Sequence, residues 1–334
     1  MQIGRIWSAF HICVLMEEIM KIIEFDDRYT DEIIDIWNNS LVFDQITRQQ
    51  FIRYHVNDFN FDKRYFLLAV DEKVVGFIFG IKRSTPYFSR GCESSIAWIK
   101  VLGVSKTNQQ IGTSLLIELE NRFKDAGVKK IVLGNYSPSY LVSGIPQEEY
   151  YPAIAFFEHH DYSQVGTSYW MERQLDEYVY PDEIDTKRKD IEKNGYIIQK
   201  FDPDKTYQLI KMMKRNFSDS WTSYVVNAIA NGTATQTIIL CSDPIGKVIG
   251  YVSRASIDCD PYRFGPFGID KDYRNQGIGE IMIHEMFKSM VEKSLNYVYF
   301  KNTDDIGCRF YKRQGMSVKR TIIKYEKILD FENK

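Results

Sequence analysis

The sequence contains no closely spaced pair of cysteines and no apolar run as long as the roughly 20 residues of a membrane span. Its five cysteines are scattered, and an odd number cannot close into a disulfide framework, so we expect a reduced, cytoplasmic compartment. The five histidines are also scattered, and His284 has no second histidine four residues later, so we expect no metal site. The net charge of −2 gives no basic footprint for nucleic acid and no charged patch for a membrane surface.

What the sequence does contain is typical of a globular protein. Apolar residues make up 44% and charged residues 26% of the 334 positions, which is enough apolar material for a real core. The length suits about two domains of ordinary size. Residues 1–19 are apolar with one arginine, but they lack the small-residue cleavage site of an export signal. We interpret them as an N-terminal extension that is poorly ordered.

The chain repeats one plan, once in residues 20–171 and again in residues 195–334. Each repeat starts with a short strand and an amphipathic helix, continues with a hairpin, a strand and a second helix, and ends with a strand, a short helix and a closing strand. This order predicts an α/β fold with a mixed sheet and helices on its faces in each repeat. Between the repeats, 13 of residues 172–193 are charged, so we interpret residues 172–194 as a solvated, charged linker.

A glycine-rich stretch, RNQGIG, opens the second long helix of the second repeat. Gly277 and Gly279 have no Cβ, so an anion can approach the amides of residues 276–280 at the positive end of the helix dipole. Arg274 adds a charge beside them. A dinucleotide fold would need a third glycine where Met282 lies, and a P-loop would need a lysine and a hydroxyl residue after the last glycine. The stretch therefore indicates a phosphate site of another kind, with close helix packing as the plain alternative.

In this setting the motif, together with the order of elements, resembles the GCN5-related N-acetyltransferase (GNAT) superfamily in its tandem two-domain form. The family signature R/Q-x-x-G-x-G/A follows the fourth strand, and Arg274, Gly277 and Gly279 match it. The resemblance extends from about Met20 to Ile328. It implies an enzyme that moves an acetyl group from acetyl-CoA to a primary amine by direct attack. The acceptor would be a small molecule, such as an amino sugar, an aminoglycoside-like compound or a metabolite amine.

The same resemblance implies roles for individual residues. It implies an acetyl-CoA site formed by Phe267, Gly268, Ile269, Arg274, Asn275, Gln276, Gly277, Ile278, Gly279, Glu280 and Asn302. Tyr311 would protonate the leaving thiolate, although a half-buried packing role is the alternative. Asp258 and Asp260 are candidates for the base that deprotonates the amine, with a plain loop role as the alternative. The acceptor cleft would be lined by Asp219, Trp221 and Tyr224, for which ordinary packing is the alternative.

The first repeat departs from the family pattern. Alignment of Gly112 with Gly279 puts Thr107 at the position of Arg274, Gln110 at that of Gly277 and Phe157 at that of Tyr311. We therefore expect the first repeat to be degenerate and the second to be catalytic. Two other functions remain open: a peptide or protein N-acetyltransferase, and a regulatory protein that binds acyl-CoA without turning it over. We expect a monomer or a homodimer.

Overall fold

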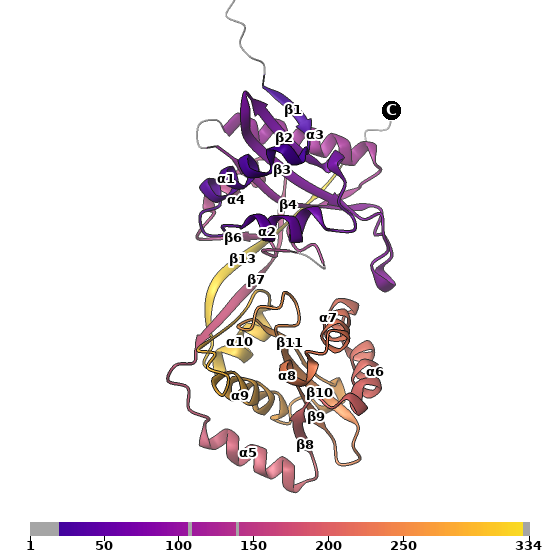
Figure 1. Ribbon diagram of the computed structural model, residues 1–334, viewed down its shortest axis with the longest axis vertical. Coiled ribbons are helices and arrows are strands. Elements are labelled where there is room, and N and C mark those ends of the chain that lie inside the picture. Colours follow the sequence, from indigo (N-terminus) through magenta and orange to yellow (C-terminus); the bar gives the residue numbers. More distant parts are fainter. Residues whose placement is uncertain (1–19, 106–108, 138–139, 330–334) are drawn as a thin grey trace, which may run out of the picture. The chain divides into compact units, whose positions relative to one another are not determined.

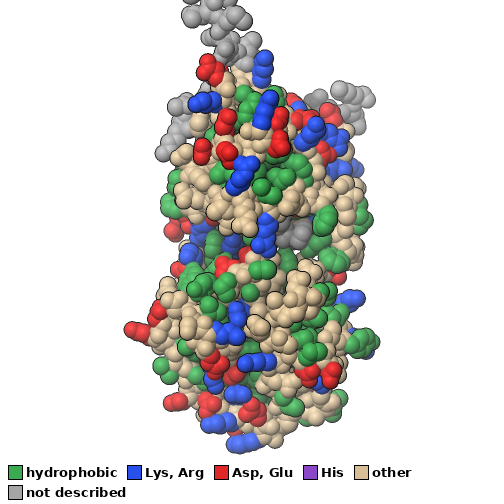
Figure 2. Space-filling model, viewed as in Figure 1, with side chains coloured by type: hydrophobic (Ala, Val, Ile, Leu, Met, Phe, Trp, Pro, Cys, Tyr) green, Lys and Arg blue, Asp and Glu red, His purple; other side chains and the backbone are tan. Residues whose placement is uncertain are grey.

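The computed structural model shows mixed sheets flanked by helices, which confirms the predicted α/β fold class (Figure 1). The structure describes residues 20–105, 109–137 and 140–329. The extension predicted at residues 1–19 lies outside them. Within the described part of the chain, no helix combines the length and the apolar character needed to cross a membrane. On the face drawn in Figure 2, Lys and Arg side chains are interspersed with Asp and Glu, in keeping with the small net charge.

The described residues form two compact units. Unit 1 comprises residues 20–81 and 101–126, and unit 2 comprises residues 82–100 and 127–329. Strand β4 (Ile96–Val104) has residues in both units. This division does not follow the predicted boundary at residue 172, because strands on both sides of that residue pair with each other in unit 2.

Unit 1 has an antiparallel sheet with the order β1-β2-β3. Its strands are β1 (Lys21–Glu24), β2 (Phe66–Asp71) and β3 (Lys73–Lys82). Its helices are α1 (Thr30–Ser40), α2 (Arg48–Phe51), α3 (Gln109–Asp125), a π-helix at Ile52–Val56 and short 3-10 helices at Asp27–Tyr29 and Lys63–Tyr65. Helix α3 packs closely on β3 because two strand positions are glycine: a Cβ at Gly76 would come within 2.8 Å of Ile111, and one at Gly80 within 2.6 Å of Phe123.

Unit 2 contains two sheets. One has the order β4-β5-β13-β7-β12, with β6 beside β13, and the other is antiparallel with the order β11-β10-β9-β8. The remaining strands are β5 (Lys130–Leu133), β6 (Ile145–Pro146), β7 (Ser163–Gln174), β8 (Ile197–Lys200), β9 (Ile238–Ser242), β10 (Val248–Arg254), β11 (Phe264–Ile269), β12 (Tyr297–Phe300) and β13 (Ser317–Ile328).

The helices of unit 2 cover these sheets. They are α4 (Tyr151–His159), α5 (Asp182–Lys193), α6 (Thr206–Asn216), α7 (Asp219–Ala230), α8 (Ala234–Thr237), α9 (Ile278–Val291) and α10 (Asp305–Arg313), with 3-10 helices at Phe88–Arg90, Pro203–Lys205 and Lys271–Tyr273. Helix α9 is the centre of the core, because Ile281, Met282 and Phe287 are fully buried against Phe264 and Val298. This burial explains why α9 is apolar over most of its surface.

The closing strands of the two repeats are exchanged. Strand β7, from the first repeat, lies between β12 and β13 of the second, and β13 lies between β5 and β7 (Figure 1). The β7–β13 pairing is antiparallel and joins nine pairs of residues. The sequence predicts closing strands around Tyr169 and Tyr325, where β7 and β13 do lie, but each completes a sheet that includes strands of the other repeat. For this reason a boundary at residue 172 does not separate two compact units.

The predicted solvated linker is instead a packed segment. Strand β7 continues to Gln174, and α5 covers most of the remaining charged residues. The segment is tied to α9: the Tyr178 hydroxyl lies 2.9 Å from Nδ1 of His284, and the Tyr180 hydroxyl donates to Glu285 at 2.7 Å. Charge content alone does not distinguish a solvated linker from a packed helix, because oppositely charged residues spaced four apart, as in Asp185–Lys189, also stabilise a helix.

Candidate functional site

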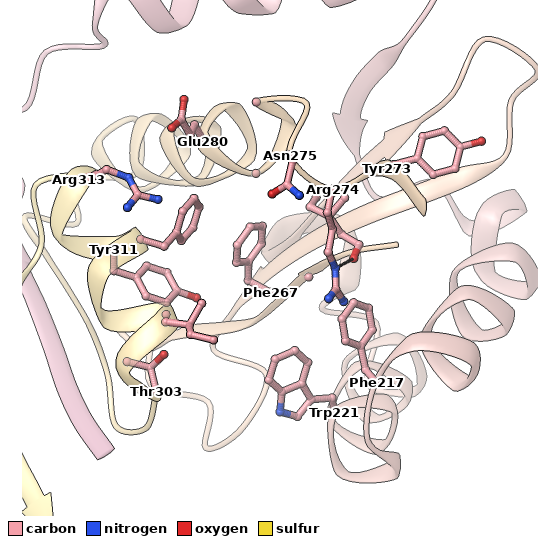
Figure 3. Close-up of a pocket in the computed structure, with 17 residues that line it drawn as sticks. Phe217, Trp221, Phe267, Tyr273, Arg274, Asn275, Glu280, Thr303, Tyr311 and Arg313 are labelled. Carbon is pink, nitrogen blue, oxygen red and sulfur yellow. Dashed lines mark hydrogen bonds between the residues drawn. The ribbon is translucent and has the colours of Figure 1, made fainter. Parts of the chain in front are cut away.

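A cavity of about 650 Å³ opens in unit 2 beside the start of α9 (Figure 3). Strand β11, the start of α9, helix α10 and the α6–α7 connection form its walls. The predicted site residues that line it are Trp221, Phe267, Gly268, Ile269, Arg274, Asn275, Gly277, Gly279, Glu280 and Tyr311. The sequence did not single out the other lining residues, which are Phe217, Tyr273, Thr303, Ile306, Gly307, Phe310 and Arg313.

The N-terminus of α9 presents free backbone donors to this cavity. Gly277 is the N-cap in the left-handed conformation, with φ of 77°, which glycine adopts without strain. The N–H groups of residues 276–279 have no hydrogen-bond partner among the described residues. The Glu280 N–H donates to the Gly277 carbonyl at 3.1 Å, so the predicted cradle of amides ends at Gly279. Four adjacent donors at the positive end of a 14-residue helix suit an anionic group.

The side chains around this helix end are arranged for a large anionic ligand. Arg274 donates from Nε to the Ile269 carbonyl at 3.1 Å and is exposed, and its guanidinium extends over the cavity in Figure 3. A Cβ on Gly279 would point to Phe267 and Phe310, at 3.5 and 3.4 Å, so the glycine leaves open the space above these two rings. Ile278, also predicted to contact the ligand, is only 1% exposed and packs in the core.

Strand β11 forms one wall with its unpaired edge. On one side it pairs with β10, and on the other its contact with β12 is the isolated bridge between Arg263 and Tyr299. Beyond that bridge the two strands are unpaired, so the β11 backbone is available to a ligand. Position 268 requires glycine because a Cβ there would lie 2.2 Å from the Phe217 ring.

Tyr311 lies on α10, with its hydroxyl directed toward the cavity in Figure 3. Its ring packs against Phe300 at 4.5 Å and Phe310 at 5.4 Å between centroids. Its hydroxyl has no hydrogen-bond partner within the described residues, and burial raises its pKa. A hydroxyl that stays protonated at neutral pH and faces a cavity is suited to donate a proton there.

The two predicted base candidates do not reach the cavity. The Asp258 carboxylate accepts from the Arg263 guanidinium in a buried ion pair. The Asp260 carboxylate accepts from the Tyr299 hydroxyl at 2.6 Å and from the Tyr262 N–H at 2.9 Å. Both therefore fix the loop that leads into β11. Arg263 and Tyr262 belong to the same loop as the two aspartates, whereas Tyr299 comes from β12 and is not near Asp260 in the sequence.

Of the three predicted acceptor residues, Trp221 lines the cavity and Asp219 and Tyr224 do not. Trp221 lines the cavity and stacks on Phe217, with centroids 5.4 Å apart and rings inclined by 24°. Tyr224 is buried in α7 and does not line the cavity, and burial raises its pKa. Asp219 accepts hydrogen bonds from the hydroxyl and the N–H of Ser89, which lower its pKa and hold the Ser89 loop against α7. Phe217 and Trp221 are four residues apart, a spacing that could have identified the pair.

Neither Asn302 nor the described aligned positions of the first repeat line the cavity. Asn302 is exposed and does not line the cavity; the next residue, Thr303, does, and its backbone exchanges hydrogen bonds of 3.1 and 2.9 Å with Tyr169 of β7. The exchanged strand therefore fixes one side of the cavity. In the first repeat, Thr107 lies outside the described residues, Gln110 is exposed in the first turn of α3, and Phe157 is buried in α4.

Comparisons with known proteins agree with this geometry. Residues 206–316 match the acetyltransferase (GNAT) family model, and no curated protein matches the sequence. The chain is similar to the GCN5-related glucosamine N-acetyltransferase region of a fungal multi-domain β-N-acetylglucosaminidase, with 18% identity and a TM-score of 0.75 over 93% of this chain and 38% of that one. The chain thus spans well under half of that protein.

Two further structures match along nearly their whole length. A GCN5-related N-acetyltransferase from Sphaerobacter thermophilus is 14% identical, with a TM-score of 0.66 over 93% of this chain and 98% of that one. A tandem GNAT protein from the clavulanic acid biosynthesis pathway is 13% identical, with a TM-score of 0.62 over 94% and 100%. At these identities the matches establish the tandem fold across both repeats.

Proposed function

We propose, from the match of residues 206–316 to the GNAT acetyltransferase family model, that the chain transfers the acetyl group of acetyl-CoA to a primary amine of a small molecule. The observation that carries the proposal is the row of free N–H groups at residues 276–279, of which Gly277 and Gly279 line the same cavity as Arg274 and Tyr311. The amides and Arg274 would hold the diphosphate, and the unpaired edge of β11 would hold the pantetheine arm.

Each remaining group has one task in this proposal. Bound acetyl-CoA supplies an acetyl thioester, and a neutral amine attacks its carbonyl carbon directly, so none of the cysteines is needed as a nucleophile. An N–H of β11 would stabilise the negative charge that develops on the carbonyl oxygen. Tyr311 would give its proton to the departing thiolate. Because Asp258 and Asp260 are held by other partners, the proton lost by the amine would go to water in the open cavity.

Among small amines, the cavity favours an amino sugar. Trp221 and Phe217 form a stacked aromatic pair at its edge, and Trp221 is 36% exposed. An exposed indole face suits the C–H face of a sugar ring. The glucosamine N-acetyltransferase region among the similar structures supports the same class.

The test is release of CoA thiol from acetyl-CoA, measured with a panel of amino sugars, aminoglycosides, metabolite amines and peptides. We expect release that depends on an amino sugar and exceeds the rate without any amine. If only peptides stimulate release, the chain acts on peptides or proteins. If CoA binds and no amine stimulates release, it is a binding protein and the proposal fails.

Substitution of Arg274 by alanine should raise the KM for acetyl-CoA and leave kcat nearly unchanged. The guanidinium would contact the diphosphate equally before and during the reaction, so its loss removes uniform binding. A lost hydrogen bond to a charged group costs about 1.5–3 kcal/mol, or roughly 10- to 150-fold in KM. Steady-state kinetics measure the split. Lys271→Ala is the matched control, since Lys271 is exposed in the same loop and does not line the cavity; an equal effect there would contradict the assignment.

A further inference from the structure

The carboxylate of Glu280 lies at the end of the cavity where the negatively charged diphosphate of the proposed ligand would bind. Glu280 lies in the first turn of α9, one residue after the free amides, and it lines the cavity (Figure 3). Its side chain is 28% exposed. A carboxylate at a helix N-terminus stabilises the empty helix, but it repels a diphosphate bound at the same end. A site for that ligand therefore needs a positive charge placed on Glu280 itself.

The segment between the repeats provides this charge. Lys187 of α5 places Nζ 2.9 Å from Oε2 of Glu280 and 2.7 Å from Oε1 of Glu183. The hydrogen bond to Glu183 and, to a smaller extent, the one to Glu280 raise the pKa of Lys187. The ammonium is therefore charged at every pH at which the protein is expected to work.

Helix α5 is held in register for this contact. Arg188 lies 3.4 Å from Glu285, the same carboxylate that accepts the Tyr180 hydroxyl at 2.7 Å. These contacts repeat along α9 at Glu280 and Glu285, so α5 presents Lys187 to the first turn and Arg188 to the next part of the helix. Ile184 is buried on the same side. A freely solvated linker would not fix a lysine at this point.

We propose that Lys187 is a positioning residue that sets the affinity of the cavity for diphosphate-bearing ligands by neutralising Glu280, so that the segment joining the two repeats is part of the acetyl-CoA site. This inference rests on the proposed function. Lys187 acts through Glu280, because its ammonium contacts Glu280 and Glu183 and is not among the residues that line the cavity.

The test is isothermal titration of the full chain with coenzyme A, without any amine, for the parent, Lys187→Met, Glu280→Gln and the double variant. Lys187→Met should raise the Kd about tenfold, equivalent to about 1.4 kcal/mol. Glu280→Gln should bind at least as tightly as the parent. In the double variant the Kd should stay within about twofold of Glu280→Gln, because no carboxylate is left to neutralise.

The control is Lys189→Met, which removes the same charge from the same helix but breaks only the pair with Asp185. It should leave the Kd within about twofold of the parent. The melting temperature of each unliganded variant separates a loss of fold from a loss of affinity. A purely structural role would lower the melting temperature of Lys187→Met and weaken binding whether or not Glu280 is present.

The inference is overturned if Lys187→Met binds coenzyme A like the parent, or if it weakens binding equally in the Glu280→Gln background. The titration of the parent protein tests separately whether the chain binds coenzyme A, as the proposed function requires. If the parent does not bind coenzyme A, both claims are wrong. If it binds with the predicted coupling but no amine is acetylated, the role of Lys187 stands and the proposed acetyl transfer does not.

Discussion

Substitution of Tyr311 by phenylalanine should lower kcat by roughly 10²-fold or more and leave the Kd for acetyl-CoA unchanged. The change keeps the ring, which packs against Phe264, Phe300 and Phe310, and removes only the hydroxyl that faces the cavity. Without that proton the thiolate must leave as a free anion. Presteady-state turnover, together with equilibrium titration of acetyl-CoA, measures the two quantities.

The pH dependence gives a second check on Tyr311. Burial raises its pKa above the ordinary value of 10.0, so the hydroxyl stays protonated through the neutral range. The kcat of the parent should therefore show no decline from this group below about pH 10. A decline at lower pH that disappears in Tyr311→Phe would contradict the environment that the structure gives this side chain.

Tyr273→Phe is the matched control for this substitution. Tyr273 lines the same cavity, but its hydroxyl donates to Asp243 at 2.7 Å and is directed away from the cavity in Figure 3. Its loss should lower stability by about 1 kcal/mol and leave kcat within about twofold. If Tyr311→Phe turns over at the parent rate when chemistry is rate-limiting, Tyr311 is only a packing residue and water supplies the proton.

A fragment of residues 195–334, which is the second repeat as the sequence predicts it, should fail to fold. It lacks β7, so β12 and β13 lose the strand between them, including the nine residue pairs that β7 forms with β13. It also lacks α5, which covers part of α9. Two exposed strand edges and an uncovered helix leave the fragment prone to aggregation and without a closed core.

A fragment of residues 163–334 is the matched control because it restores both β7 and α5. We expect it to show cooperative unfolding in urea and a folded circular dichroism spectrum, while the shorter fragment shows neither. Equal stability of the two fragments would show that the exchanged strand is dispensable. In that case the repeats would be independent domains, as the sequence pattern alone predicts.

The sequence was informative where structure is local. The glycine signature predicts the helix start at Gly277 because helix capping, dipole and backbone freedom all depend on neighbouring residues. Tyr311 and Trp221 were found from their places in a known order of elements. The roles of these residues remain predictions, but the cavity brings all three together.

The sequence was uninformative where partners are distant. Alternation of apolar residues assigns the faces of β7 and β13, but it does not say which strand lies beside which. Asp260 accepts from Tyr299, which is 39 positions later in the chain, and the pairing of Asp258 with Arg263 depends on burial that composition does not show. Likewise, the charges of α5 look solvated until Lys187 is seen beside Glu280.

The central claim is that the cavity at the start of α9 binds acetyl-CoA and that the first repeat does not. Isothermal titration of the intact protein with acetyl-CoA, repeated with Arg274→Ala, tests it most directly. We predict one dominant site per chain, with a Kd that rises roughly 10-fold or more in Arg274→Ala. Two sites of similar affinity, or a single site unchanged by Arg274→Ala, would contradict the claim.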